Sequence, residues 1–279
     1  MVTRRTDDEL RTIRYDVDGH VATVTLHRPH RHNAWTGRMH AEFRTAMRDL
    51  EVDLDVRAVV VTGTPPAFCV GGDSDALAKH AASGGYDTGL PAEPARPGVH
   101  LRPEYDADFA WMYAYRTPIV AAVNGAAAGV GLALALFCDL RFGAAPAKLT
   151  TAAPKLGLPA EYGMSWVLPR LVGVTRAADL LLSGRVVTVA ETAEWGIWNG
   201  VLDDGAATLR AAQDYARLLA TSVGPNAVGV TKQQLYADLH RHDVAASVRE
   251  SKELLDRAMG TAEYREGIAA LRERRPPRF

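Results

Sequence analysis

The sequence predicts an α/β fold, and three observations support that prediction. Two short apolar runs rich in β-branched residues, AVVVT at 58–62 and IVAAV at 119–123, are typical of buried strands. Each run is followed by a glycine-bearing turn and then by a helical pattern. From residue 206 onward every periodic segment is helical. We therefore expect an α/β body over residues 1–205 and a helical region over residues 206–279, which could also cover a neighbouring subunit.

The composition is that of an ordinary globular protein, and it argues against several classes of function. Of the 279 residues, 47% are apolar and 23% are charged, and the formal net charge of -1 gives no general reason to bind nucleic acid or a membrane surface. No stretch reaches about 18 consecutive apolar residues, the length that a membrane span needs. Cys69 and Cys138 lie in apolar surroundings, which argues against a disulfide framework, and the first residues lack the apolar core of a signal peptide. We expect a cytoplasmic protein.

The chain begins with a predicted hairpin and a helix. Strands at 12–18 and 21–26 are joined at Asp18-Gly19, a strong hairpin signal. Thr36 is placed to cap the helix, because its hydroxyl can accept a hydrogen bond from a free N–H group of the first turn. The apolar residues that share one face of this helix are Met39, Phe43, Met47 and Leu50.

Positive charge gathers after the second predicted strand, in the stretch HRPHRHNAW. It holds Arg28 and Arg31, together with histidines at 27, 30 and 32. One interpretation is contact with a phosphate group, and the other is a solvated loop. A metal site is not favoured, because no carboxylate or cysteine ligand lies within the cluster.

Two turns join a predicted strand to a predicted helix through glycine. The first, in GTPPAFCVGGD, contains Gly71 and Gly72, and Asp73 is placed to cap the next helix. The second, in VNGAAAGVGLALALF, contains Gly129 and Gly131, each of which costs a helix about 1 kcal/mol relative to alanine. Free N–H groups at a helix start favour negative charge, so two such turns could give two amides to one oxygen, as in an oxyanion hole. The alternative is a helix that only packs tightly on a sheet.

The remaining elements follow from the same patterns. Residues 83–103 are rich in glycine and proline, and we expect a lid or a disordered loop there. Short strands are predicted at 140–142, 148–153 and 201–202. Helices are predicted at 104–115, at 161–171 with Glu161 opening the helix, and at 173–183, 189–195, 208–222, 226–239, 243–259 and 261–272.

Five pieces of the sequence, in this order, resemble the crotonase (enoyl-CoA hydratase/isomerase) superfamily. They are LHRPHRHNAW, VVVTGTPPAFCVGGDSDAL, TPIVAAVNGAAAGVGLALALFCDLRF, GLPAEYGMSWVLPRLVG and LLLSGRVVTVAETAEWGIWNGVL. The resemblance implies a spiral of ββα turns with a C-terminal helical trimerisation region, and assembly into trimers or dimers of trimers. It also implies an acyl-CoA thioester substrate, with coenzyme A as part of the substrate, no permanently bound cofactor and no metal.

The resemblance also implies roles for particular residues. By motif position, the backbone N–H groups of Gly72 and Val130 would form an oxyanion hole, in agreement with the two turns described above. Arg28 matches a position near the CoA phosphates. The residues that match the segment contacting the CoA adenine and pantetheine are Ala67, Phe68, Cys69, Val70 and Gly71.

The chain departs from the well-studied enoyl-CoA hydratases at both of their catalytic glutamates. The matching positions hold Ala133 and Ala153. Two methyl groups cannot hold a water molecule as two carboxylates do, so the two-glutamate hydration mechanism is not expected. The sequence is therefore placed in a branch that lacks both hydratase glutamates.

One acid remains at a position that other branches use. Glu161, in LPAEYG, matches the catalytic aspartate of dienoyl-CoA isomerases and the acid of some other branches, including dehalogenases. We expect it to move a proton on the acyl chain, in a pocket of Ala133, Ala153, Tyr162 and Trp166 whose apolar surroundings would raise its pKa. The alternative is a plain helix-start residue, stabilised by the helix dipole.

The expected function is therefore that of an acyl-CoA-processing enzyme of hydratase/isomerase type, a lyase or isomerase of fatty acid metabolism. It would stabilise a thioester enolate and use one acid. Two alternatives stay open: a non-catalytic acyl-CoA-binding member of the family, and a carbon–carbon or thioester hydrolase of the same fold. The small residues and the long predicted lid favour a roomy pocket, for a branched or ring-bearing acyl chain.

Overall fold

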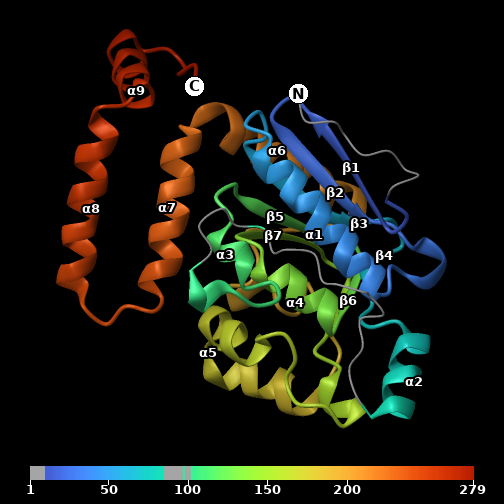
Figure 1. Ribbon diagram of the computed structural model, residues 1–279. Helices are drawn as coiled ribbons and strands as arrows, with labels where there is room; N and C mark the ends of the chain where they lie inside the picture. The colour runs from blue at the N-terminus through green and yellow to red at the C-terminus, as the bar shows by residue number, and fades with distance from the viewer. Residues whose placement is uncertain (1–9, 85–96, 98–101) are drawn as a thin grey trace.

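The structure, a computed structural model, describes residues 10–84, 97 and 102–279, and its centre consists of two β-sheets (Figure 1). The six-stranded sheet has the order β1-β2-β3-β5-β7-β10, and the four-stranded sheet has the order β4-β6-β8-β9. The strands of the larger sheet are β1 (Ile13–Asp18), β2 (Val21–Leu26), β3 (Ala58–Gly63), β5 (Ile119–Val123), β7 (Leu140–Ala144) and β10 (Gly200–Leu202). Those of the smaller sheet are β4 (Ala67–Cys69), β6 (Ala126–Ala128), β8 (Lys148–Thr150) and β9 (Val187–Thr188).

From β3 to β8, consecutive strands alternate between the two sheets, and this alternation makes the body a spiral. β3 leads into β4, β5 into β6 and β7 into β8, so each turn of the chain gives one strand to each sheet. The neighbours β3, β5 and β7 are parallel, and so are β4, β6 and β8. A helix follows two of the turns: α2 (Ser74–Ser83) after β4, and α4 (Val130–Phe137) after β6. The expected α/β spiral of ββα turns is confirmed.

Apolar side chains cover both faces of the larger sheet, because successive residues of a strand point to opposite sides. In β3, Val59 and Val61 join the core that contains α4 and α1 (Gly37–Val52). Ala58 and Val60 face the other way, toward the alanines of α6 (Gly205–Ser222). The predicted cap of α1 is confirmed, since the hydroxyl of Thr36 accepts a hydrogen bond from the Met39 N–H.

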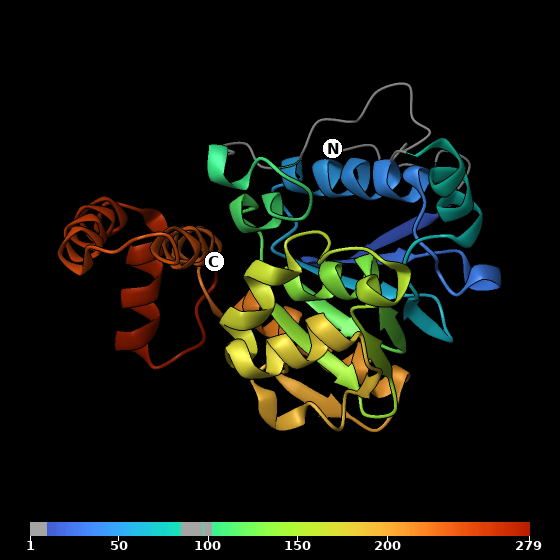
Figure 2. The same ribbon diagram turned by 90° about the horizontal axis from the view of Figure 1, so that it is seen from below.

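The last three helices of the chain do not cover either sheet. Figures 1 and 2 both show α7 (Pro225–Asp238), α8 (Val244–Met259) and α9 (Ala262–Glu273) standing to one side of the body. α7 is tied to the body by Asp139, whose carboxylate lies 2.7 Å from Lys232 Nζ and accepts a 2.8 Å hydrogen bond from the Tyr236 hydroxyl. α6 packs on the larger sheet, whereas α8 has no buried residue. The helices after residue 205 therefore differ in how they contact the body, and the division into 1–205 and 206–279 stays a prediction.

Three predicted elements differ from the structure. The helix predicted at 104–115 is interrupted, because Phe109 has a left-handed φ of 58°, and only Pro103–Tyr105 (a 3₁₀ turn) and α3 (Trp111–Ala114) are helical. The helix predicted at 189–195 is wrong except for a 3₁₀ turn at Ala193–Trp195. The helix that Glu161 was expected to open begins later, as α5 (Met164–Ser183), with a break in φ/ψ at Gly173.

Two further predictions concern the loop at 83–103 and membrane-spanning segments. The predicted lid at 83–103 lies almost entirely outside the described residues. Within the described ranges, none of the helices combines the length and the apolar character needed to cross a membrane.

Candidate active site

The candidate site lies where three parallel strands end at the same edge of the smaller sheet. β4 is followed by Gly71-Gly72, β6 by Gly129-Val130 and β8 by Thr151. Because parallel neighbours point the same way, the chain leaves all three strands at one edge. This topology brings together the two glycine turns that the sequence analysis singled out.

The two glycine turns are in close contact. A Cβ atom placed on Gly71 would lie 3.3 Å from the carbonyl oxygen of Ala128, and one placed on Gly129 would lie 3.9 Å from the Gly71 Cα. Both glycines have a positive φ, of 101° for Gly71 and 46° for Gly129, and residues other than glycine rarely adopt such values. A Cβ on Gly131 would lie 2.3 Å from the Cys69 carbonyl oxygen. Bare backbone is therefore required wherever the second turn and α4 meet the first.

The hydrogen bonds of Trp35 fix the direction of the Gly72 amide. Trp35 N–H donates to the Gly71 carbonyl (2.7 Å), and its own carbonyl accepts from the Asp73 N–H (2.9 Å). The Gly72 N–H belongs to the same planar trans peptide as the Gly71 carbonyl and points the opposite way, so it points away from Trp35. β6 is the strand that borders β4 in the smaller sheet, and the Trp35 segment follows the other edge. The Val130 N–H is in the first residue of α4, where a helix offers no carbonyl to it.

Glu161 lies beside the second turn and outside any helix. Its Oε2 atom is 3.9 Å from the position that a Cβ on Gly129 would take. The N-cap of α5 is Gly163, which has no side-chain capping bond, so Glu161 does not cap that helix. Half of the side chain is buried, and burial raises the pKa of the carboxyl group. Within residues 10–84 and 102–279, the carboxylate has neither a hydrogen bond nor an ion pair, so desolvation is not offset.

Tyr162, the residue after Glu161, belongs to a cluster of aromatic rings. The ring of Phe109 lies 5.5 Å from that of Tyr162 and 5.7 Å from that of Trp35, measured between centroids. Phe109 and Tyr162 both have positive φ, 58° and 50°, a conformation that is uncommon for residues of their size. Strain of this kind often gathers at functional sites, and it positions these two rings against each other here.

Ala133, Ala153 and Trp166 are the other residues of the predicted acyl pocket. Ala133, in α4, and Ala153, after β8, are fully buried, at 0% and 1% exposure. The ring of Trp166 is stacked on His240 at 5.4 Å, and the Arg170 guanidinium lies 3.9 Å from its centroid. The place of Trp166 in an acyl pocket stays a prediction.

The predicted cluster of positive charge is paired with two aspartates. Arg28 Nη1 lies 3.0 Å from Asp73 and donates to the Ala34 carbonyl at 2.6 Å. Arg31, which is more exposed, pairs with Asp75 and lies 3.7 Å from Asp73. Burial alone would raise the pKa of Asp73, but the Arg28 hydrogen bond, the Asp75 N–H and the charges of Arg28 and Arg31 together outweigh burial and hold that pKa below its usual range. Asp73 also caps α2, as predicted, by accepting from the Asp75 N–H.

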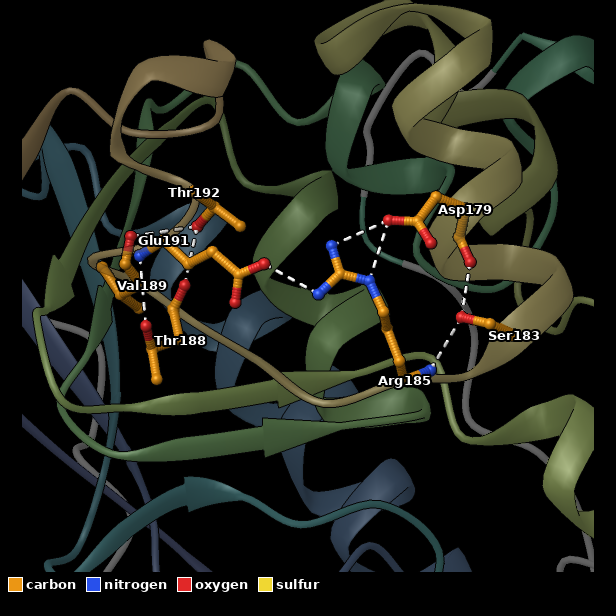
Figure 3. A network of polar contacts seen from close by, with 7 residues as sticks. All are labelled: Asp179, Ser183, Arg185, Thr188, Val189, Glu191 and Thr192. Atoms are coloured by element: carbon orange, nitrogen blue, oxygen red, sulfur yellow. Dashed lines mark hydrogen bonds and ion pairs between the residues drawn. The ribbon is translucent and has the colours of Figure 1, made fainter.

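A polar network that sequence reasoning missed lies between the end of α5 and the segment that contains and follows β9 (Figure 3). Arg185 pairs with Asp179 of α5 at 2.8 Å and with Glu191 at 2.7 Å, which joins the end of α5 to the segment after β9. Next to this network, the hydroxyl of Thr150 donates to the Gly184 carbonyl and that of Thr151 donates to the Leu180 carbonyl. The far end of α5 is thereby fixed to β8 where this strand reaches the site. A signal for these contacts is absent from the sequence pattern, because the partners come together only in the fold.

Other nucleophiles and metal ligands contribute little. Burial raises the pKa of both Cys69 and Cys138 to about 12, so neither thiol is ionised at neutral pH. Among the described residues, no three His, Cys, Asp or Glu side chains are grouped as a metal site would require.

Comparisons with known proteins identify the family of the chain. The model of the family described as enoyl-CoA hydratase/isomerase matches residues 16–279. The 1,2-epoxyphenylacetyl-CoA isomerase of Escherichia coli K12 is 34% identical over 268 residues, which cover 94% of this chain and 96% of the relative.

Solved structures show the same likeness. The crystal structure of a probable enoyl-CoA hydratase/isomerase from Mycobacterium abscessus has a TM-score of 0.81 at 33% identity and covers 96% of this chain and 98% of its own. An enoyl-CoA hydratase from Polaromonas sp. JS666 has a TM-score of 0.82 at 26% identity, with 95% and 98% covered. The chain is therefore an enzyme of the enoyl-CoA hydratase/isomerase family, within the crotonase superfamily that its motifs resemble.

Proposed function

We propose that this enzyme binds an acyl-CoA thioester with its carbonyl oxygen between the backbone N–H groups of Gly72 and Val130. Two features support the proposal. The turns that carry these amides are in contact, and the Gly72 N–H faces away from Trp35 toward the side of β6. Two donors aimed at a developing oxyanion typically lower a barrier by about 3 to 4 kcal/mol each.

Glu161 would serve as the proton-transferring acid and base. The observation that carries this assignment is an unpaired, half-buried carboxylate beside the Gly129 turn, with a raised pKa. As a base, it removes a proton from the acyl carbon next to the thioester carbonyl, and the electron pair moves to the carbonyl oxygen. As an acid, it returns that proton to a carbon further along the chain, so the double bond shifts without change in mass.

Double-bond migration is the reaction that these residues favour, with single-acid hydration as the variant. Hydration by two glutamates lacks its groups, since Ala133 and Ala153 occupy those positions and both are buried. The relative from Escherichia coli K12 is named an isomerase. The ring of Tyr162, which follows Glu161 in the chain and lies against that of Phe109, is suited to a ring-bearing acyl group.

The coenzyme A part of the substrate would follow the first turn. We infer that the backbone from Ala67 to Gly71 contacts the adenine and pantetheine, and that Arg28 lies near the phosphates. Since Arg28 is already paired with Asp73, the more exposed Arg31 is the better placed of the two to meet a phosphate. We further expect a homotrimer or a dimer of trimers in the cytoplasm, and no cofactor besides the CoA of the substrate.

The substitution Glu161→Gln tests the assignment. We expect turnover of enoyl-CoA substrates to fall about a hundredfold or more, because general acid–base catalysis supplies that much, with little change in thioester affinity. Turnover is measured on a mixed panel of enoyl-CoA esters with mass-resolved products, and affinity by calorimetry. Glu253→Gln, on the exposed face of α8, is the matched control and should keep full activity.

Each alternative has its own signature in this assay. Products 18 mass units heavier with a cleaved fragment would identify a hydrolase. Thioester binding without turnover across the whole panel would identify a binding protein. Near-normal turnover by Glu161→Gln would remove Glu161 from the mechanism.

A further inference from the structure

Asn33 is a fully buried polar residue next to the first turn, and its backbone is in the left-handed region. Its exposure is 0% and its φ is 58°, a conformation that asparagine tolerates better than most residues. It lies in the loop that joins β2 to α1, between His32 and Trp35. A buried carboxamide needs several partners, and those partners reveal what this one holds in place.

The Asn33 carboxamide connects two segments of chain. Its Nδ2 donates to the carbonyl oxygens of Thr64 (2.8 Å), Ala67 (2.8 Å) and Phe68 (3.2 Å). Its Oδ1 accepts a 2.9 Å hydrogen bond from the Arg28 N–H. Three acceptors on one side and a donor on the other fit only one orientation of the amide. The side chain therefore binds the free edge of β4 to the loop that carries Arg28.

The residues around Asn33 extend this contact to the proposed oxyanion amide. His32 accepts a hydrogen bond from the Val70 N–H at 3.3 Å. Trp35 bonds to Gly71 and Asp73, on either side of Gly72. The loop thus behaves as an edge strand alongside residues 67–73, and the Asn33 carboxamide sets its register on β4. A shift of this loop would turn the Gly72 N–H.

We propose that Asn33 is a positioning residue for the reaction: its carboxamide fixes the direction of the Gly72 amide toward the thioester oxygen. The inference rests on the proposed function, because it assumes that Gly72 donates to the substrate. Asn33 itself does not touch the substrate. A displacement of about 1 Å at a reacting group can cost about a hundredfold in rate, so the effect should appear in turnover and in carbonyl polarisation.

The experiment follows a bound thioester by its absorption. Cinnamoyl-CoA is the probe, because its conjugated acyl group absorbs at longer wavelength when the carbonyl oxygen accepts hydrogen bonds. The variants are Asn33→Ala, which removes all four bonds, and Asn33→Ser, whose hydroxyl keeps one donor and a small volume. Asn199→Ala is the control away from the site, since Asn199 is exposed and its Oδ1 accepts from the Arg141 N–H (2.9 Å), between β7 and β10.

The wild-type protein should give a clear red shift. Asn33→Ala should lose more than half of it, Asn33→Ser should retain an intermediate shift, and both should bind the probe within about threefold of wild type. Turnover should fall about tenfold to a hundredfold, with kcat affected more than KM. Asn199→Ala should lower the melting temperature but keep the full shift and turnover.

Three results would contradict the account, and each has a different meaning. An unchanged shift in folded Asn33→Ala or Asn33→Ser would show that Asn33 does not position the amide. An absent shift in the wild type would instead contradict the proposed function. If Asn33→Ala and Asn199→Ala lose stability and shift to the same extent, the role of Asn33 is only structural.

Discussion

In the second turn, between β6 and α4, the chain is held mainly by packing, with one backbone hydrogen bond from the Gly129 N–H to the Thr150 carbonyl (3.0 Å). In the first turn, between β4 and α2, it is held by several hydrogen bonds from one distant loop. Every residue of α4 is buried, and its N-cap, Gly129, has no side-chain capping bond. α2 has no buried residue, and Asp73 caps it. The first turn depends on Asn33, Trp35 and Arg28, which all come from one distant loop.

The difference shows two ways to fix a backbone amide. Packing against a buried helix leaves no freedom but demands glycine where backbones touch, as at Gly131. Hydrogen bonds to an edge segment hold the first turn without a buried helix, so α2 can lie on the surface. A site next to a surface helix can open to a large substrate. The three predictions that follow test this comparison, from the largest expected effect to the smallest.

Gly131→Ala should be the most damaging substitution. A Cβ there would lie 2.3 Å from the Cys69 carbonyl oxygen and 2.8 Å from its sulfur, so the backbone of α4 or β4 must move. We expect a loss of about 3 kcal/mol or more in the free energy of unfolding, measured by urea titration. Gly260→Ala is the control, because its Cβ would meet the Arg257 carbonyl at an ordinary 3.7 Å, and stability should change by less than about 1 kcal/mol.

Asp73→Ala tests the hydrogen-bonded turn. The substitution removes the cap of α2 and the partner of Arg28, and it should cost about 1 to 2 kcal/mol at neutral pH. Because the folded-state pKa of Asp73 is lowered, its contribution is present above the pKa of the unfolded chain and is lost as the pH falls through the folded-state pKa. Asp75→Ala, which removes an exposed carboxylate paired with Arg31, should cost less than about 0.5 kcal/mol. Equal losses from both would contradict the account of the first turn.

Much of this arrangement could be predicted from the sequence, because the strands of the larger sheet are β-branched runs and the helices carry caps and apolar stripes. β4 and β6 were not identified as strands, since three residues, AFC or AAA, are too few to show a period. The pairing of Arg28 with Asp73 joins residues 45 positions apart, so only the fold reveals it. Glu161 was predicted to open a helix, because the left-handed Gly163 that delays the start of α5 leaves no mark in the hydrophobic pattern.

Glu161→Gln should have the smallest effect on stability, and its sign is informative. Burial raises the folded-state pKa of Glu161, so the carboxyl contributes fully below the pKa of the unfolded chain, and that contribution is lost as pH rises through the folded-state pKa. The neutral variant should therefore be more stable than wild type at pH 7, by no more than about 1 kcal/mol because the carboxylate is half-exposed. Thermal melts should show this gain vanish near pH 4. A variant less stable at pH 7 would reveal a native partner of the carboxylate.

Val130→Pro tests the central claim most directly, because it deletes the N–H group that is the proposed second donor and keeps an apolar side chain at this buried position. Val130 is the first residue of α4, a position where proline fits the helix and the missing N–H had no helical partner. Ser74→Pro places proline at the first residue of α2, whose N–H is not a proposed donor. With cinnamoyl-CoA as probe, we predict that Val130→Pro loses most of the red shift and about a hundredfold or more of turnover, while Ser74→Pro keeps both. A folded Val130→Pro protein with wild-type shift and turnover would contradict the claim that residues 72 and 130 share one thioester oxygen.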